Sequence, residues 1–192
     1  MHTLAFLIPI LFVVVIYIAR IVELRTRRDT IKGNKQESVS LILFIATGTL
    51  MFLGAMLEYV LQHKTFSWPF MAAGVLCAVL SFKLRRSAIL ALGKFWSLHV
   101  EIRNEHQFVT SGPFRWVRHP TYLSMILELL AAGLALQAFL TMIIVIPVLF
   151  VPTLLYRIKI EEAALVAKFG ESYREYQKVV PALFPAKLPL VK

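Results

Sequence analysis

The stretch 121–156 constrains the fold of this chain most, because it contains a single charged residue, Glu128. One membrane-spanning helix needs only about 20 apolar residues, so this run is too long for one crossing. We therefore expect a tight helical hairpin with its turn near residues 136–138. Pro147 and Pro152 are expected to kink the returning helix.

Three further apolar stretches precede the hairpin, at roughly 3–22, 39–61 and 67–82. The hairpin itself divides into stretches at 121–137 and 138–156. The 192 residues are 58% hydrophobic, whereas soluble domains average about 45–50% apolar residues. The sequence therefore predicts an all-α fold, a multi-pass helical membrane protein with about five transmembrane helices.

Basic residues indicate how these helices cross the membrane. All but one of the 21 Lys and Arg residues lie at the end of the first stretch, in 23–38, in 83–120 or after 156, and the exception is Lys64. Because cytoplasmic loops collect such residues, we expect the N-terminus outside and the C-terminus in the cytoplasm. Segment 83–120 and the tail then form a cytoplasmic cap. The same bias accounts for the net charge of +10, so no nucleic-acid partner is predicted, whereas contacts with membrane lipids are.

The tail after the hairpin has helical spacing, with Arg157, Glu161, Leu165 and Phe169 in register. Gly170 is a candidate C-cap, and a second short helix is expected from Glu171 to Val179.

Polar residues capable of chemistry gather at both ends of the hairpin: His106, Arg115, Arg118, His119 and Tyr122 before it, and Arg157, Glu161 and Glu162 after it. If the two hairpin helices are antiparallel neighbours, both groups meet at one membrane surface. The lone Cys77 excludes a disulfide or cysteine-based metal framework within the chain, and we predict no metal site. Common phosphate-binding, dinucleotide-binding and zinc-protease motifs are absent from the sequence.

The order and spacing of these residues carry a family resemblance. Gly112-Pro113-Phe114, Arg118-His119-Pro120-x-Tyr122, an apolar hairpin, Arg157-x-x-x-Glu161-Glu162, Phe169-Gly170-x-x-Tyr173-x-x-Tyr176 and Val180-Pro181 follow one another. This arrangement resembles the isoprenylcysteine carboxyl methyltransferase family. Leu92-Gly93, Phe95-Trp96-Ser97 and the segment from His106 to Thr110 are similar to its prokaryotic members. The resemblance covers about residues 90–185.

The resemblance implies a membrane enzyme that transfers a methyl group from S-adenosyl-L-methionine to a carboxylate, typically that of a prenylated cysteine. It implies a single domain over 1–192, with variable N-terminal spans in 1–85 and a catalytic region in 86–185. It places the cofactor against His106, Val109, Phe114, His119, Pro120, Tyr122 and Glu161. Arg157 and Glu161 are the expected catalytic residues: Arg157 holds the acceptor carboxylate and Glu161 binds the cofactor ammonium group. Phe114 departs from the tyrosine of the animal enzymes.

The acceptor is expected to be lipidic or prenylated and to enter from the bilayer. A prokaryotic cell membrane is favoured over the endoplasmic reticulum, and the oligomeric state is open. Alternatives are a phospholipid or small-molecule amine or thiol methyltransferase, a sterol-type reductase and a non-catalytic membrane scaffold. Arg157 favours an anionic acceptor.

Several of these residues also have simpler interpretations. Arg157 and Glu161 have the spacing of a surface ion pair. Arg115, Arg118 and Lys94 suit lipid head groups, and Tyr173 and Tyr176 suit packing. Glu128 could face an acceptor tunnel, whereas Glu58 could simply reach water; both stand outside the predicted site.

Overall fold

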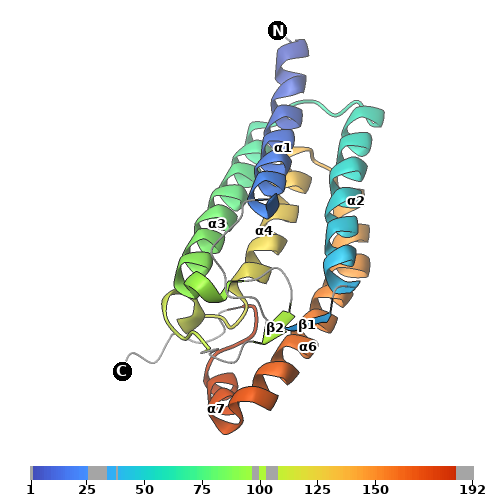
Figure 1. Cartoon of the computed structure of the whole chain (residues 1–192). Helices are drawn as coiled ribbons and strands as arrows, with labels where there is room; N and C mark the ends of the chain where they lie inside the picture. The colour runs from blue at the N-terminus through green and yellow to red at the C-terminus, as the bar shows by residue number, and fades with distance from the viewer. Residues whose placement is uncertain (1, 26–33, 38, 97–99, 103–107, 185–192) are drawn as a thin grey trace.

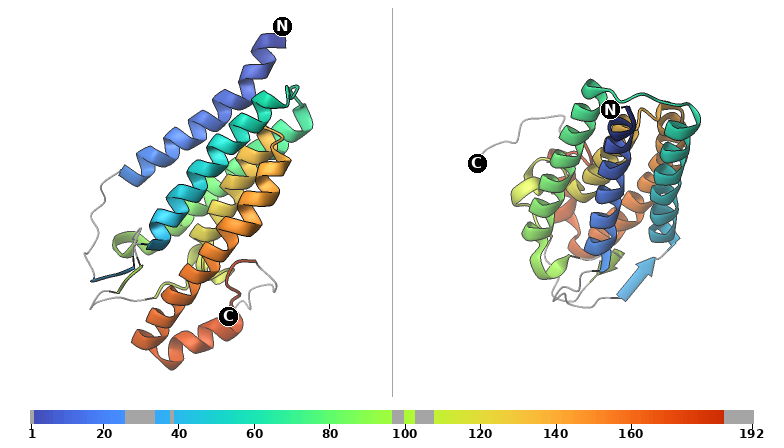
Figure 2. Two further views of the ribbon diagram at one scale, coloured as in Figure 1. Left: turned by 90° about the vertical axis from the view of Figure 1, so that its right-hand side faces the viewer. Right: turned by 90° about the horizontal axis from the view of Figure 1, so that it is seen from above.

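The computed structural model describes residues 2–25, 34–37, 39–96, 100–102 and 108–184. Helices α1 (His2–Arg25), α2 (Val39–Leu61), α3 (Trp68–Leu92) and α4 (Pro120–Ala135) form a bundle with one long helical segment that returns from α4 (Figure 1). That segment consists of α5 (Phe139–Ile144), the π-helical turn η3 (Val145–Phe150) and α6 (Val151–Phe169). Figure 2 shows that α6 extends beyond the other helices and that α7 (Glu171–Val179) folds back beneath the bundle.

The predicted hairpin is confirmed. Helix α4 ends at Ala135 and α5 begins at Phe139, with Gln137 in the left-handed region at φ 52°. Pro147 lies inside the π-helical turn, where the wider spacing accommodates a residue that lacks an N–H donor. Gly170 ends α6 with φ 58°, and α7 spans the residues expected for the second short helix.

The helices have the composition of an integral membrane protein, although their lengths vary more than those of the five predicted spans. Three have the length and composition to cross a membrane: Leu4–Glu23, Val39–Leu61 and Phe139–Phe169. Helix α4 is apolar but shorter. Helix α3 continues beyond the apolar stretch 67–82, through Lys83, Arg85 and Arg86, to Leu92. Arg85 has partners on neighbouring helices, which are described below.

Two short strands were not predicted. Strands β1 (Asn34–Glu37) and β2 (Val100–Ile102) pair antiparallel at the end of the bundle that also carries α7 (Figure 1). Two 3₁₀ turns, η1 (Gly93–Phe95) and η2 (Gly112–Arg115), belong to the connection between α3 and α4. Together with α7 these elements form the predicted cap, and the fold remains all-α apart from this ribbon.

Small residues allow α4 to pack closely against its neighbours. A Cβ atom at Gly74 of α3 would lie 2.9 Å from the Ala131 carbonyl oxygen of α4, closer than side chains tolerate. A Cβ atom at Gly133 would overlap the Met142 side chain of α5. These glycines allow the C-terminal half of α4 to lie close against α3 and the returning helix.

Glu58 does not reach water, contrary to the sequence-based interpretation. It is 8% exposed, and its carboxylate accepts hydrogen bonds from the backbone N–H groups of Leu140 and Thr141 at 3.2 and 2.8 Å. The Thr141 hydroxyl donates a third bond at 2.8 Å. The first N–H groups of a helix have no partner within it, so Glu58 caps α5 from α2 and fixes the hairpin turn.

We expect Glu58→Ala to lower the free energy of unfolding by about 1–3 kcal/mol, because the N–H groups of the first α5 turn lose their acceptor. Glu58→Gln, which retains one acceptor oxygen, should cause a smaller loss. The measurement is the unfolding midpoint in detergent, with Gln62→Ala, at an exposed position directly after α2, as control. Equal midpoints for Glu58→Ala and Gln62→Ala would contradict the capping role.

Candidate functional site

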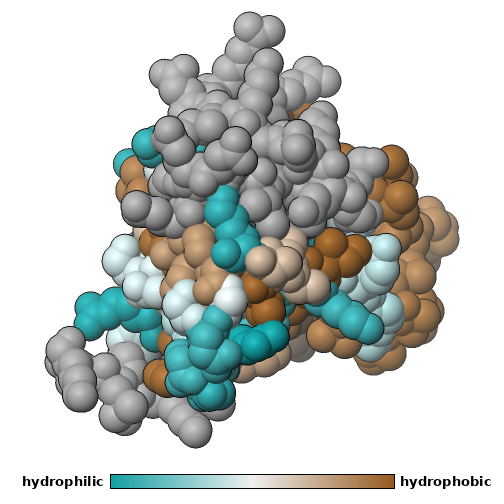
Figure 3. All heavy atoms as spheres, turned by 60° about the horizontal axis from the view of Figure 1, so that its bottom comes forward, coloured by the Kyte–Doolittle hydropathy of each residue, from teal (hydrophilic) through white to brown (hydrophobic). Residues whose placement is uncertain are grey.

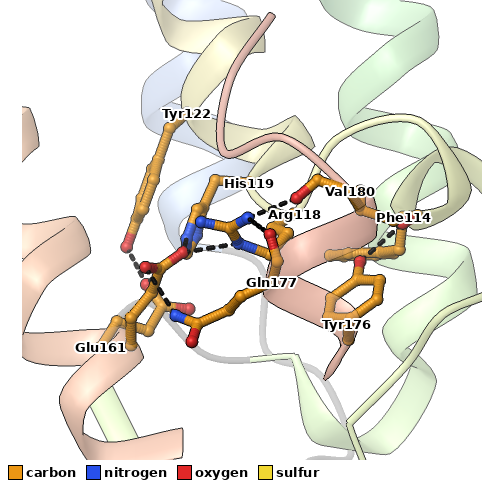
Figure 4. Close-up of polar contacts among 9 residues, drawn as sticks. Phe114, Arg118, His119, Tyr122, Glu161, Tyr176, Gln177 and Val180 are labelled. Carbon is orange, nitrogen blue, oxygen red and sulfur yellow. Dashed lines mark hydrogen bonds and ion pairs between the residues drawn. The ribbon is translucent and has the colours of Figure 1, made fainter. Parts of the chain in front are cut away.

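The site lies at the cap end, where the turn before α4, helices α6 and α7 and the tail after α7 converge (Figure 4). The turn before α4 supplies Arg118 and His119, and the tail after α7 runs along it. The Arg118 and His119 N–H groups donate to the carbonyl oxygens of Pro181 and Ala182 at 2.9 and 3.0 Å. The chain end thereby braces the turn that begins α4, and α6 faces that turn from the other side.

Arg118 connects the turn before α4 to α6, to α7 and to the tail after α7. Its Nε donates to Glu162 of α6 at 2.7 Å, and its Nη1 donates to the backbone oxygens of Gln177, at 3.0 Å, and Val180. The Gln177 side-chain amide donates to the other Glu162 oxygen at 2.9 Å. Arg118 is therefore directed into the protein rather than toward lipid head groups, whereas Arg115 is exposed.

We expect Arg118→Ala to destabilise the cap, because it removes one donor from the partly buried Glu162 carboxylate and one from each of the two backbone carbonyl oxygens. The expected loss is about 2–4 kcal/mol in the free energy of unfolding. Limited proteolysis after α7 should also become faster. Arg115→Ala is the matched control on the same turn, and an equal effect of the two substitutions would argue against the bracing role.

A chain of hydrogen bonds joins α2, α4 and α6 beside this brace. Arg157 Nε donates to the Tyr122 hydroxyl at 2.8 Å, and that hydroxyl donates to Glu161 Oε2. His119 stacks on the Tyr122 ring at 5.3 Å between centroids, with an angle of 14°. Its Nε2 lies 3.0 Å from Glu162 Oε1, and its Nδ1 lies 3.9 Å from Glu161. Tyr122 therefore links the two expected catalytic residues.

Arg157 has an environment that the sequence does not reveal. It is 4% exposed, and its Nη1 donates at 2.8 Å to Ser40, at the beginning of α2. Its guanidinium also lies 5.6 Å from the Phe44 ring centroid and 5.9 Å from that of Tyr122. The interpretation of Arg157 and Glu161 as a surface ion pair therefore does not fit: Arg157 is buried and held in a fixed direction. Ser40 carries no motif, which is why sequence reasoning missed it.

Aromatic side chains form the opposite wall. Phe108 packs edge-on against Phe169 and Tyr173, with centroids 5.0 and 5.5 Å apart, and Tyr176 lies 5.7 Å away. Burial, with smaller contributions from nearby Glu162 and Glu161, raises the pKa of Tyr173 well above its usual range. Burial likewise raises the pKa of Tyr176, which stays protonated and donates to the Phe114 carbonyl oxygen at 2.6 Å. The packing role predicted for the two tyrosines is confirmed.

A cavity of about 340 Å³ connects these groups to the middle of the bundle. Its cap end is lined by the polar and aromatic residues just described, and its other end by apolar residues of α1, α2 and α4, among them Val13, Ile45, Phe52, Met125 and Leu129. Figure 3 shows hydrophilic side chains at this end of the molecule beside the hydrophobic flank of the helices. One cavity therefore offers a polar chamber and a lipid-like channel.

Most of the predicted site residues meet in this cavity. Its wall includes Val109, Phe114, His119, Tyr122, Arg157 and Glu161. Pro120 is buried but is not part of the wall, because its ring occupies the first position of α4. His106 lies outside the described residues.

A family model described as isoprenylcysteine carboxyl methyltransferase matches residues 74–167, from α3 to α6. The chain belongs to the isoprenylcysteine carboxyl methyltransferase family. The protein-S-isoprenylcysteine O-methyltransferase of Schizosaccharomyces pombe is 36% identical over 116 residues, which cover 59% of this chain and 48% of that protein. The human protein of the same name is 30% identical over 173 residues, or 79% of this chain and 57% of that protein. The chain spans about half the length of the curated relatives it matches.

The similar proteins also include a bacterial one. The protein YpbQ of Bacillus subtilis is 34% identical over 95 residues, which cover 48% of this chain and 55% of that protein. The region matched by the isoprenylcysteine carboxyl methyltransferase model contains the Arg118 turn, the hairpin and both acidic residues of α6. Tyr173 and Tyr176 lie beyond it, although they close the same cavity.

Proposed function

We propose that this protein is an S-adenosyl-L-methionine-dependent methyltransferase that methylates the carboxylate of a prenylcysteine or a similar lipidic acceptor at the cytoplasmic surface of a membrane. The observation that carries the proposal is the single cavity that joins Glu161 and Arg157 to an apolar channel between helices. A soluble, charged cofactor and a membrane-embedded acceptor need those two environments side by side.

The residues of the polar chamber fit the cofactor. When bound, S-adenosyl-L-methionine would supply a sulfonium methyl group for transfer to the acceptor oxygen, with S-adenosylhomocysteine as the neutral leaving group. The side chain of Glu161 is 33% exposed, and its carboxylate can accept a charge-assisted hydrogen bond from the cofactor ammonium group. The Phe108, Tyr173 and Tyr176 rings provide a surface on which a purine base can stack.

The proposed reaction needs positioning more than proton transfer, because a carboxylate is already ionised near neutral pH. A buried arginine held in a fixed direction supplies that positioning, since a guanidinium can bind a carboxylate through two parallel hydrogen bonds. Arg157 is held by Ser40 and Tyr122 and lines the cavity. The same cation disfavours an amine acceptor, whose product would become positively charged beside it.

The proposal predicts transfer of a labelled methyl group from S-adenosyl-L-methionine to N-acetyl-S-farnesyl-cysteine by the purified protein. The product should release its label on mild alkaline treatment, as a methyl ester does and a methylated amine or thioether does not. Label incorporated only into phospholipid amines or free thiols would contradict a carboxylate acceptor. Failure to transfer to any of the three would contradict the enzyme assignment.

A further inference from the structure

A second polar cluster lines the cavity, and the proposed function does not use it. It consists of Arg20 and Glu23 on α1, Arg85 on α3 and Glu128 on α4. Ionisable side chains within apolar helices are rare, and they commonly mark pathways for polar groups. The cluster is distinct from the Arg157 and Glu161 chamber, because it lies on helices that do not supply that chamber's acidic residues.

Arg85 is the centre of this cluster. It is 6% exposed, and its Nε, Nη1 and Nη2 donate to Ser124 Oγ at 3.0 Å, Glu23 Oε2 at 3.3 Å and Glu128 Oε2 at 2.6 Å. Arg20 also donates to Glu23 Oε2, at 3.1 Å. The two arginines and two glutamates have opposite formal charges, so the burial of Arg85 is compensated.

Arg85 also lines the cavity, but the two carboxylate side chains are more exposed than its guanidinium. The side chains of Glu23 and Glu128 are 19% and 20% exposed, compared with 8% for Arg85, and both line the cavity. A carboxylate only accepts hydrogen bonds, so this part of the wall is complementary to a donor such as a hydroxyl or an amide N–H. A purely hydrocarbon chain would gain nothing from contact with it.

The position of Glu128 on α4 sets its distance from the proposed reaction centre. Tyr122, Met125, Glu128 and Leu129 line the cavity from one face of this helix. Glu128 follows Tyr122 by six residues, which corresponds to about 9 Å along the helix axis. In an extended S-prenylcysteine, about 8 Å separates the carboxylate from the end of the first five-carbon unit. An acceptor whose carboxylate lies at Arg157, and whose chain runs along this face of α4, therefore has its first prenyl unit at the level of Glu128.

We propose that Glu128, oriented by Arg85, is a specificity-determining residue that accepts a hydrogen bond from a donor group in the first prenyl-length segment of the acceptor. The inference rests on the proposed function and narrows its substrate class to lipids that carry a hydroxyl or amide N–H in addition to the carboxylate. A link between α1 and α3 needs only Glu23 and Arg85. Glu128 adds a carboxylate on the cavity face of α4, where a leucine would suit a hydrocarbon.

The test compares two probes, N-acetyl-S-prenylcysteine with and without a hydroxyl on the terminal carbon of its prenyl group. Each is titrated calorimetrically into the full-length protein saturated with S-adenosylhomocysteine. We expect the wild-type protein to bind the hydroxylated probe about 10-fold more tightly, as one hydrogen bond to a charged group predicts. Glu128→Gln should reduce the ratio to about 2 or 3, and Glu128→Leu should abolish it. Met125→Leu, one turn away on the same face, should preserve it.

Each outcome decides the inference. Equal affinities in the wild-type protein, binding of neither probe, or a ratio unchanged in Glu128→Gln and Glu128→Leu would overturn it. A purely structural role for Glu128 would weaken both probes equally in Glu128→Gln and leave their ratio at the wild-type value. Binding of S-adenosylhomocysteine in these experiments separates the two proposals, because its absence would contradict the proposed function itself.

Discussion

Replacement of Glu161 by alanine should weaken the binding of S-adenosylhomocysteine by about 10- to 100-fold, the cost of one charge-assisted hydrogen bond to the cofactor ammonium group. The carboxylate is well placed for that bond, because one oxygen is fixed by Tyr122 while the side chain stays 33% exposed to the cavity. Calorimetric titration of the purified protein measures the effect.

Two variants make this result specific. Glu161→Gln keeps the volume and the bond with Tyr122 but removes the charge, so its affinity should fall almost as far as that of Glu161→Ala. Glu175→Ala removes an exposed carboxylate of α7 and should leave the affinity unchanged. Wild-type affinity in Glu161→Gln would show that the negative charge does not bind the cofactor.

Replacement of Arg157 by lysine should lower kcat/KM for the carboxylate acceptor by about 100- to 1000-fold, while the affinity for S-adenosylhomocysteine stays within about 2-fold. Lysine retains the positive charge but has no planar pair of donors, so it cannot hold Ser40, Tyr122 and an acceptor carboxylate at once. Labelled-methyl transfer measures the first quantity and calorimetry the second.

Ser40→Ala is the companion variant, because it removes only the hydroxyl that orients Arg157. We expect it to lower kcat/KM by less than about 10-fold, since a neutral hydrogen bond contributes about 1 kcal/mol. The unfolding midpoint in detergent confirms that both variants are folded. Equal losses of turnover and cofactor affinity in Arg157→Lys would contradict the separate roles of Arg157 and Glu161.

Local features of the fold were predictable because their signals lie in neighbouring residues. The uncharged run after Glu128 predicted the hairpin, and Gly170 predicted the end of α6, which the structure confirms. The meeting of His119 and Tyr122 with Arg157 and Glu161 also followed from sequence, because an antiparallel hairpin brings its two ends together.

The remaining site residues could not be predicted because their roles depend on distant helices. Arg85 reads as a loop residue next to Lys83 and Arg86, yet its partners Glu23 and Glu128 keep it inside α3. Ser40 and Glu58 act across gaps of 117 and 83 residues, toward Arg157 and Thr141. No periodicity or motif reports such contacts, since they arise only when the bundle has formed.

Titration of the wild-type protein with S-adenosylhomocysteine tests the central claim most directly, because the claim requires a cofactor chamber at the cap end of the cavity. The account predicts saturable binding to one site per chain, at the same affinity in Met125→Leu and weaker in Glu161→Ala. Absence of saturable binding by the folded wild-type protein would contradict it.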